Sequence, residues 1–354
     1  MMSWFDRFKR KKEQEEPDYE YCPRCYANLT LQKGYHNDLP CWICAGCGEM
    51  LINPEVEGNT AWICDGCGRM LNIQPGFSED CGIWTCTECG TENKIDPSET
   101  YASEEEYQAA KRDPYRGLSD EEALRLLHYH NEGTIDDRED ILSVRHVFTE
   151  KPYLEKHLTV YNRDIYEYLR EHPVAHMPKI IDLFESRNCL IVIEEFVEGR
   201  TVAELLEHGP LSEKEALSIT KSVCAILDEL HGLPTPIIHR DIKPANIIIT
   251  PEHETCLLDM NVAKWYDPDE TDDTRHMGTQ FYAAPEQAGY GLTASITKTD
   301  IYAVGILLNV MLTGAFPKEK RPDGRLWHII ERCISLNAED RYTAKELIQA
   351  LDDL

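Results

Sequence analysis

The sequence has no long apolar run. None of its segments approaches the roughly 18 to 20 consecutive apolar residues that a membrane-spanning helix requires. Its N-terminus, rich in charge, also lacks the apolar centre of a secretory signal peptide. We therefore expect a cytoplasmic protein without a membrane span.

Basic residues are scarce relative to acidic ones. The 354 residues include 36 lysines and arginines against 64 aspartates and glutamates, a formal net charge of −28. Nucleic-acid binding needs a basic surface that neutralises phosphates, so this balance argues against nucleic acid as a partner. The apolar fraction of 42% is ordinary for globular domains, and the length is enough for two or three of them.

Cysteine, in contrast, is concentrated in one region. Ten of the fourteen cysteines lie between Cys22 and Cys89, eight of them in Cys-x2-Cys pairs, which in a cytoplasmic chain indicate metal binding. The region repeats with a period of 42 residues. Outside the cysteines, the positions that correspond are Leu29 and Leu71, Gln32 and Gln74, Gly34 and Gly76, Tyr35 and Phe77, Trp42 and Trp84, and Gly48 and Gly90.

Each copy reads Cys-x2-Cys-x18-Cys-x2-Cys, so we expect two modules, at residues 21–50 and 60–93. Four thiolates suit a closed tetrahedral Zn2+ site, whose role is structural because no position is left for water or substrate. Most of the folding free energy of so small a module would come from the metal. The predicted zinc ligands are Cys22, Cys25, Cys44 and Cys47 in the first copy, and Cys64, Cys67, Cys86 and Cys89 in the second.

Cys41 and Cys81 lie off the repeat, and we expect them to be packed thiols rather than ligands. A site made from the two inner Cys-x2-Cys pairs would leave the outer pairs without partners, so the repeat argues against it. The modules resemble zinc ribbons, and that resemblance implies a docking surface for proteins or nucleic acids. Acids outnumber bases between Tyr21 and Asn93, which favours a protein partner.

The other parts of the chain differ in composition. Residues 1–20 form a charged tail, for which a solvated segment is favoured over a short amphipathic helix at a membrane surface. Residues 94–133 read as an acidic linker with two short helices, beginning at capping boxes formed by Ser103 with Glu106 and Ser119 with Glu122. From residue 134 to 354, strand-like and helical patterns are mixed, as in one α+β domain.

Within that domain, residues 239–246 read His-Arg-Asp-Ile-Lys-Pro-Ala-Asn between two apolar runs. This segment resembles the catalytic loop of serine/threonine protein kinases, H-R-D-x-K-x-x-N. The resemblance implies that Asp241 orients the attacking hydroxyl, that Lys243 lies beside the transferred phosphate, and that Asn246 binds Mg2+. Asp259, in Asp-Met-Asn, stands where the family carries D-F-G and would also bind Mg2+.

Three later positions extend the resemblance. Residues 278–286 read Gly-Thr-Gln-Phe-Tyr-Ala-Ala-Pro-Glu, like the end of an activation segment, and Glu286 is expected to pair with Arg341. Asp300 is expected to anchor the catalytic loop from a buried helix. Thr274 is the first candidate for a phosphorylation that orders the segment, ahead of Thr271 and Thr279.

The chain as a whole is similar to bacterial eukaryotic-like serine/threonine kinases with N-terminal zinc ribbons. The resemblance implies a two-lobed α+β domain, with the smaller lobe at about 138–195 and the larger at about 196–354. It also implies ATP and Mg2+ as cofactors, two structural zinc ions, and transfer of the γ-phosphate to serine or threonine of a protein substrate.

The smaller lobe matches the family less well. No G-x-G-x-x-G occurs between Asp136 and Tyr153, where we expect the loop that covers the phosphates. Lys156 is the expected phosphate-contacting lysine, with Lys151 as the alternative, and its acidic partner is expected from the following helix. The candidates for that partner are Asp164 and Glu167.

Residues 193–197 resemble the hinge that receives adenine, with main-chain groups of Glu195 and Val197 as its contacts. Glu194 then occupies the gatekeeper position, either as a nucleotide contact or as the partner of a neighbouring cation. Two hypotheses follow. The chain is an active kinase, or it is a pseudokinase that acts as a signalling scaffold, which the missing glycines and the Asp-Met-Asn sequence support.

Overall fold

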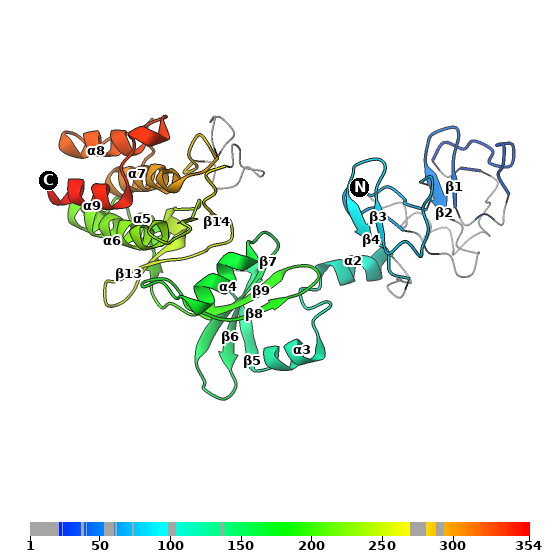
Figure 1. The fold of residues 1–354 in the computed structure, drawn as a ribbon, viewed down its shortest axis with the longest axis horizontal. Helices are drawn as coiled ribbons and strands as arrows, with labels where there is room; N and C mark the ends of the chain where they lie inside the picture. The colour runs from blue at the N-terminus through cyan, green and yellow to red at the C-terminus, as the bar shows by residue number, and fades with distance from the viewer. Residues whose placement is uncertain are drawn as a thin grey trace. The chain divides into compact units, whose positions relative to one another are not determined.

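The computed structural model describes residues 21–22, 24–36, 39, 41–52, 60, 62–72, 74–97, 104–135, 138–269, 281–287 and 294–354. The chain divides into two compact units, Met1–Tyr107 and Gln108–Leu354, called here the first unit and the second unit (Figure 1). The expected tail at 1–20 and the three threonines Thr271, Thr274 and Thr279 lie outside the described residues.

The first unit contains two small modules, each built around an antiparallel two-stranded sheet. Strand β1 (Cys41–Ile43) pairs with β2 (Met50–Ile52), and β3 (Ile83–Thr85) pairs with β4 (Glu92–Lys94). Each module has its own buried cluster, one around Leu29 and the other around Leu71. The predicted 42-residue repeat is thus a repeat of structure.

The turns that carry the cysteines explain the glycines beside them. The residue after the second cysteine of each pair has a positive φ, +70° at Gly48, +69° at Gly68 and +77° at Gly90. Glycine adopts this left-handed conformation without steric cost. In the remaining turn the position is held by Tyr26 at φ +59°, which is uncommon for a residue with a side chain.

The two predicted helices are present, α2 (Glu104–Arg112) and α3 (Asp120–Leu126). Ser103, the predicted cap of the first, lies outside the described residues. Ser119 caps α3 in a reciprocal capping box with Glu122. The segment expected to be a linker, 94–133, is however partly packed into the second unit. Leu118 and Leu126 pack on the buried Phe184 of the second unit, because the outer face of its sheet is apolar and must be covered.

The second unit opens with a five-stranded antiparallel sheet in the order β5-β6-β7-β9-β8. Because β5 precedes residue 134, this lobe begins earlier than the sequence predicted, within the segment expected to be a linker. Helix α4 (Arg163–Glu171) packs against the sheet through Ile165 and Leu169 (Figure 1). The strands are β5 (Tyr129–Ile135), β6 (Arg138–His146), β7 (Pro152–Leu158), β8 (Ile180–Glu185) and β9 (Leu190–Glu195).

The rest of the second unit is mainly helical, which confirms the two-lobed α+β fold. Its helices are α5 (Val202–Leu206), α6 (Glu213–His231), α7 (Thr297–Thr313), α8 (Arg325–Cys333) and α9 (Ala344–Asp352), with 3-10 turns η1 (Pro244–Asn246) and η2 (Ala338–Asp340). Its short strands are β10 (Arg200–Thr201), β11 (Ile237–Ile238), β12 (Ile247–Ile249), β13 (Thr255–Leu257) and β14 (Lys264–Trp265).

One buried apolar cluster joins the two lobes of this unit. It runs from Leu190 in the sheet through Ile165 of α4 to Leu227 of α6 and Leu307 of α7. The short strands β11 to β14 lie beside these helices and carry the loops on which the catalytic motif stands. Among the described residues, no helix combines the length and the apolar composition that crossing a bilayer requires.

Candidate functional site

Four sulfur atoms converge in each module of the first unit. In both predicted ligand sets the Sγ atoms lie within 4.8 Å of one another. The Sγ–Sγ distances are 3.6 Å for Cys22 to Cys47 and 3.5 Å for Cys64 to Cys89. A tetrahedron with Zn–S distances of about 2.3 Å separates its sulfurs by about 3.8 Å, so the donor sets fit zinc.

A glutamine supports one cysteine of each site. Gln32 Nε2 donates to Cys44 Sγ at 3.4 Å, while its Oε1 accepts from Trp42 Nε1 and from the main-chain N–H of Ala45, both at 2.8 Å. The second module repeats these contacts with Gln74, Cys86, Trp84 and Thr87. The repeat alignment contained this glutamine, but the sequence alone did not indicate its role.

The hydrogen bonds change the acidity of the supported thiols. Burial alone would raise the pKa of Cys44, but the bonds from Gln32 and from the main-chain N–H groups of Gly46 and Cys47 lower it to about 6. The pKa of Cys86 is likewise lowered to about 6 against the effect of burial, first by Gln74. A thiol that ionises readily is a better metal ligand.

The two cysteines outside the repeat do not join either cluster. Cys41 is half-buried in β1, whereas Cys81 is exposed, so the prediction that both are packed thiols was wrong for Cys81. Cys81 falls in a turn before β3, and residues 78 to 83 are all exposed, so its side chain has no core to enter.

In the second unit, the motif at 239–246 forms a loop with its polar groups interlinked. Asp241 Oδ2 accepts from Lys243 Nζ at 2.7 Å and from Asn246 Nδ2 at 3.0 Å. Asn246 also donates to the main-chain oxygen of Asp241 at 2.9 Å. Two donors on one oxygen fix the orientation of the carboxylate.

A buried acid on α7, Asp300, anchors the main chain of this loop. Asp300 accepts from the main-chain N–H of His239 at 2.9 Å and of Arg240 at 2.7 Å, and His231 contacts the same carboxylate at 2.9 Å. Burial alone would raise the pKa of Asp300, but these partners hold it below its ordinary value. Arg240 has φ +68°, a strained conformation that these bonds maintain.

The Asp-Met-Asn segment keeps two of the properties that D-F-G supplies. Asp259 adopts φ +70°, a left-handed conformation that aspartate tolerates, beside the catalytic loop. Met260 is buried in the core, so an apolar side chain still packs at the second position. Asn261, which replaces glycine, accepts a hydrogen bond from Tyr166 Oη of α4 at 2.8 Å.

The structure places Lys156 on β7, but its partner is not on α4. Lys156 Nζ lies 2.6 Å from Glu194 Oε1 of β9, and both side chains are about 7% exposed. Asp164 is exposed, and Glu167 pairs with Arg163 at 2.9 Å on the outer side of the helix. The expectation of a helix acid is therefore corrected: the gatekeeper acid pairs with the cation.

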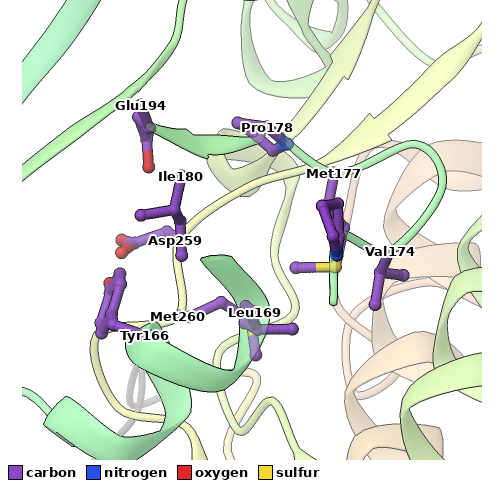
Figure 2. A pocket seen from close by; sticks show the side chains of 10 residues that line it. Tyr166, Leu169, Val174, Met177, Pro178, Ile180, Glu194, Asp259 and Met260 are labelled. Carbon is purple, nitrogen blue, oxygen red and sulfur yellow. The ribbon is translucent and has the colours of Figure 1, made fainter. Parts of the chain in front are cut away.

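A hollow lies between α4, the end of β9 and the segment of Asp259 (Figure 2). Tyr166, Glu194 and Asp259 bring polar groups to it. The rest of its wall is mostly apolar, formed by Leu169, Pro173, Val174, Met177, Pro178, Ile180 and Met260. Sequence reasoning did not assign Tyr166 or Asn261 to the site, because the contact between them spans 95 residues of sequence.

The segment in which the phosphate-covering loop was expected is mostly strand. Strand β6 pairs with β5 as far as Arg138 with Ile135, and residues 138–151 lie in β6 and in its turn to β7. Gly133, with φ +138°, stands in β5 just before the hairpin turn. Residues 134–140, around the pairing of Ile135 with Arg138, also contain no glycine.

The expected hinge at 193–197 covers the end of β9 and the connection that follows it. Glu195 ends that strand, and its main-chain N–H donates to the oxygen of Lys179 at 2.9 Å. Val197 is half-buried in the connection to the larger lobe. Lys151, the alternative to Lys156, is exposed at the turn before β7.

The ion pair expected at the end of the activation segment is present. Arg341 donates to Glu286 through Nη1 at 2.6 Å and Nη2 at 3.0 Å, and both residues are buried. Thr299 of α7 also donates to Glu286, at 2.8 Å. The side chain of Gln287 donates to the main-chain oxygen of Arg240 at 2.8 Å, so this segment contacts the catalytic loop directly.

Comparison with known proteins agrees with this geometry. The family model of the protein kinase domain matches residues 134–332, more than half of the chain. The chain belongs to this family. The match covers the catalytic loop, the Asp259 segment and the pair of Lys156 with Glu194.

Several curated relatives are serine/threonine-protein kinases of bacteria. The chain is 36% identical over 149 residues to PrkC of Bacillus subtilis, covering 42% of this chain and 22% of that protein. It is 29% identical over 218 residues to PkaA of Streptomyces coelicolor, covering 53% and 39%. It is 32% identical over 155 residues to pkn2 of Myxococcus xanthus, covering 42% of this chain and 18% of that protein. The chain thus spans less than half the length of these relatives.

Proposed function

We propose that the chain is a serine/threonine protein kinase that transfers the γ-phosphate of ATP to a protein hydroxyl. The arrangement around Asp241 carries the proposal: its carboxylate is held by Lys243 and Asn246, and Asp300 fixes the backbone of the same loop. The names of the bacterial relatives, all serine/threonine-protein kinases, support the choice of serine and threonine as acceptors.

In this proposal Asp241 orients the substrate hydroxyl and accepts its proton as the oxygen attacks phosphorus. Lys243, 2.7 Å from Asp241, supplies positive charge where negative charge develops on the transferred group. Lys156 would contact the α- and β-phosphates, and main-chain groups of Glu195 and Val197 would hold adenine. These side chains thus orient the reacting groups and neutralise the charge of the phosphates, as phosphoryl transfer requires.

The donor atoms beside Asp241 suit Mg2+. Hard divalent cations prefer oxygen ligands, and Asp259 offers a carboxylate. The amide nitrogen of Asn246 is engaged with Asp241, so its amide oxygen is the atom that would bind. Bound Mg2+ neutralises charge on the β- and γ-phosphates.

The two zinc sites are proposed to be structural, with the modules serving as a docking surface for a protein. Every ligand position in each cluster is filled by a cysteine, so no position is left for a substrate. The described basic side chains of these modules are few, and Arg24 is already paired with Glu49. That charge pattern supports a protein rather than a nucleic acid as the partner.

A catalytically inactive scaffold is the second candidate function. Two observations favour it: the β5–β6 hairpin has no glycine at its turn, and the ammonium of Lys156 is engaged by Glu194. The retention of Asp241, Asn246 and Asp259 in a linked arrangement favours the active enzyme, because these groups supply the base and the metal ligands.

Transfer of radiolabelled phosphate from ATP with Mg2+ distinguishes the two candidates. Wild type and Asp241→Asn are purified with zinc retained and compared for labelling of the chain itself and of a generic basic protein. Asp323→Asn, which makes the same change at an exposed surface position, is the matched control. We expect Asp241→Asn to lower the rate by at least about 100-fold, since a general base contributes that much or more.

The acceptor residue is then identified by hydrolysis of the labelled protein. Phosphoserine or phosphothreonine supports the proposal. No labelling by wild type, together with no thermal shift on adding Mg2+ and ATP, would instead support the scaffold. Equal labelling by wild type and Asp241→Asn would show that the activity does not come from this site.

A further inference from the structure

The ion pair of Lys156 is set by the register of the sheet. In the pairing of β7 with β9, Lys156 lies opposite Val192, and Leu154 lies opposite Glu194. Lys156 and Glu194 are therefore diagonal neighbours on the same face, within reach of each other's long side chains. Their 2.6 Å contact depends on two adjacent strands and not on the position of a helix.

Helix α4 presents no acid toward this pair. Its buried Tyr166, which is 2% exposed, lines the same hollow as Glu194 and Asp259 (Figure 2). Of its three acids, Asp164 and Glu171 are exposed, and Glu167 pairs with Arg163. A carboxylate on α4 therefore cannot be what orients the lysine.

The helix is connected instead to the segment that follows Asp259. Tyr166 Oη donates to Asn261 Oδ1 at 2.8 Å, and the main-chain N–H of Asn261 donates to Asp259 Oδ1 at 3.4 Å. Asn261 stands where the family motif has glycine, and its side chain bonds to Tyr166 of α4. Lys156 is thus paired with an acid of the sheet, and α4 bonds to the segment that follows Asp259.

We propose that Glu194 is the positioning residue for Lys156, a role that does not require α4 to move toward the sheet. The inference rests on the proposed kinase function, in which Lys156 contacts the phosphates. A buried ammonium is costly unless it is paired. Burial alone would lower the pKa of Lys156, but Glu194 and then Asp259 raise it above its ordinary value, which keeps the lysine charged.

Glu194→Gln tests the proposal because it keeps the shape and removes the charge. We expect kcat/KM for ATP to fall at least ten-fold. Glu167→Gln, on the outer side of α4, and Glu171→Gln, exposed at its end, are the comparisons and should lose less than two-fold. A greater loss in Glu167→Gln than in Glu194→Gln would overturn the proposal.

A second measurement reports on the lysine itself and needs no activity. Acetylation of Lys156 by acetic anhydride is followed by mass spectrometry from pH 6 to 11. This range includes the pH at which an ordinary lysine loses its proton, about 10.4. Because only the uncharged amine reacts, loss of Glu194 should move the profile to lower pH, while Glu171→Gln leaves it in place. An unchanged profile in folded Glu194→Gln, verified by circular dichroism, would overturn the proposal.

The two measurements separate this inference from the kinase proposal. A shifted profile in a protein whose wild type transfers no phosphate would refute the kinase activity while confirming the pair. If Glu194→Gln does not fold, Glu194→Asp retains the charge with a shorter reach, and the profile is measured on that variant. A profile identical to wild type in folded Glu194→Asp, together with unchanged kcat/KM, would show that the position of this carboxylate does not matter.

Discussion

Gln32 and Gln74 each connect a thiol of a four-cysteine cluster to a tryptophan and to the main chain. The same three contacts occur in both modules although the surrounding residues differ. Tyr35 and Phe77 pack edge-to-face on the same tryptophans, with ring centroids 5.4 and 5.5 Å apart. Such outer contacts orient metal ligands and contribute to metal affinity.

Replacing Gln32 by leucine should therefore lower the zinc affinity of the first site by about 10- to 100-fold, because the thiol of Cys44 loses a hydrogen-bond donor. Competition with a chromophoric chelator measures this loss. Gln74→Leu should have the same effect on the second site.

Lys33→Ala, a change at the exposed neighbour of Gln32, is the control. An equal loss of zinc affinity in Lys33→Ala would indicate a general destabilisation of the module. No loss in Gln32→Leu would show that this hydrogen bond is dispensable.

Four helices of the second unit begin at capping boxes that can be recognised in the sequence. Ser or Thr followed three residues later by Glu marks the starts of α3, α5, α6 and α9, and the reciprocal bonds are present in all four. Each cap satisfies main-chain N–H groups that the helix itself leaves without partners. Helix α6 is the longest of these and packs in the core between α7 and α9.

Ser212→Ala should lower the free energy of unfolding by about 1 kcal/mol, because the main-chain N–H of Glu215 loses its acceptor at the start of α6. Urea unfolding followed by circular dichroism measures the change. Ser222→Ala, within the same helix and away from its ends, is the control. A loss as large in Ser222→Ala would mean that the effect comes from the helix interior and not from the cap.

The ion pair of Glu286 with Arg341 connects the segment at 281–287 to the residues before α9. Burial alone would raise the pKa of Glu286, but the two bonds from Arg341 lower it below the ordinary value of 4.5. A lowered folded-state pKa stabilises the fold above the unfolded-state pKa, and the stabilisation is lost as the pH falls through the folded value.

Arg341→Leu should lower the free energy of unfolding at pH 7 by about 3 to 5 kcal/mol, because it leaves a buried carboxylate without its partner. The difference from wild type should shrink below about pH 4, where glutamate becomes protonated. Denaturant unfolding at pH 7 and pH 3.5 measures both effects. The same difference at both pH values would contradict the ionic origin of the stabilisation.

The two units have separate cores. The buried clusters of the ribbons contain residues of the first unit only, and the large cluster contains residues of the second unit only. The ribbon clusters are small, so metal binding must supply most of their folding free energy, on the order of 10 kcal/mol per site. The second unit has an apolar core large enough to fold without metal.

A strong chelator should therefore release two zinc ions per chain and unfold the ribbons, while the thermal transition of the second unit stays within about 2 °C of the holo-protein, since no core residue of that unit is lost. Limited proteolysis shows which part opens: cleavage is expected between residues 21 and 97. A lower transition temperature of the second unit after chelation would show that the ribbons stabilise it.

Local sequence determined much of this protein. The zinc ligands follow from spacing, because two turns separated by a fixed length can supply four thiolates. The catalytic loop, Asp259, Asp300 and the pair of Glu286 with Arg341 follow from motifs in a fixed order. The bonds among these residues join distant parts of the chain, Arg240 to Asp300 and Glu286 to Arg341, but each residue could be predicted because it belongs to a recognisable motif.

Only the tertiary structure decided the partner of Lys156, the contact of Tyr166 with Asn261 and the start of the second unit. Each depends on which strands are adjacent and in which register, and on how α4 is rotated over the sheet. Asp164, Glu167 and Glu194 are equally acidic in the sequence. Strand register places Glu194 beside the lysine and helix rotation turns the other two outward, and neither is encoded by residue type or spacing alone.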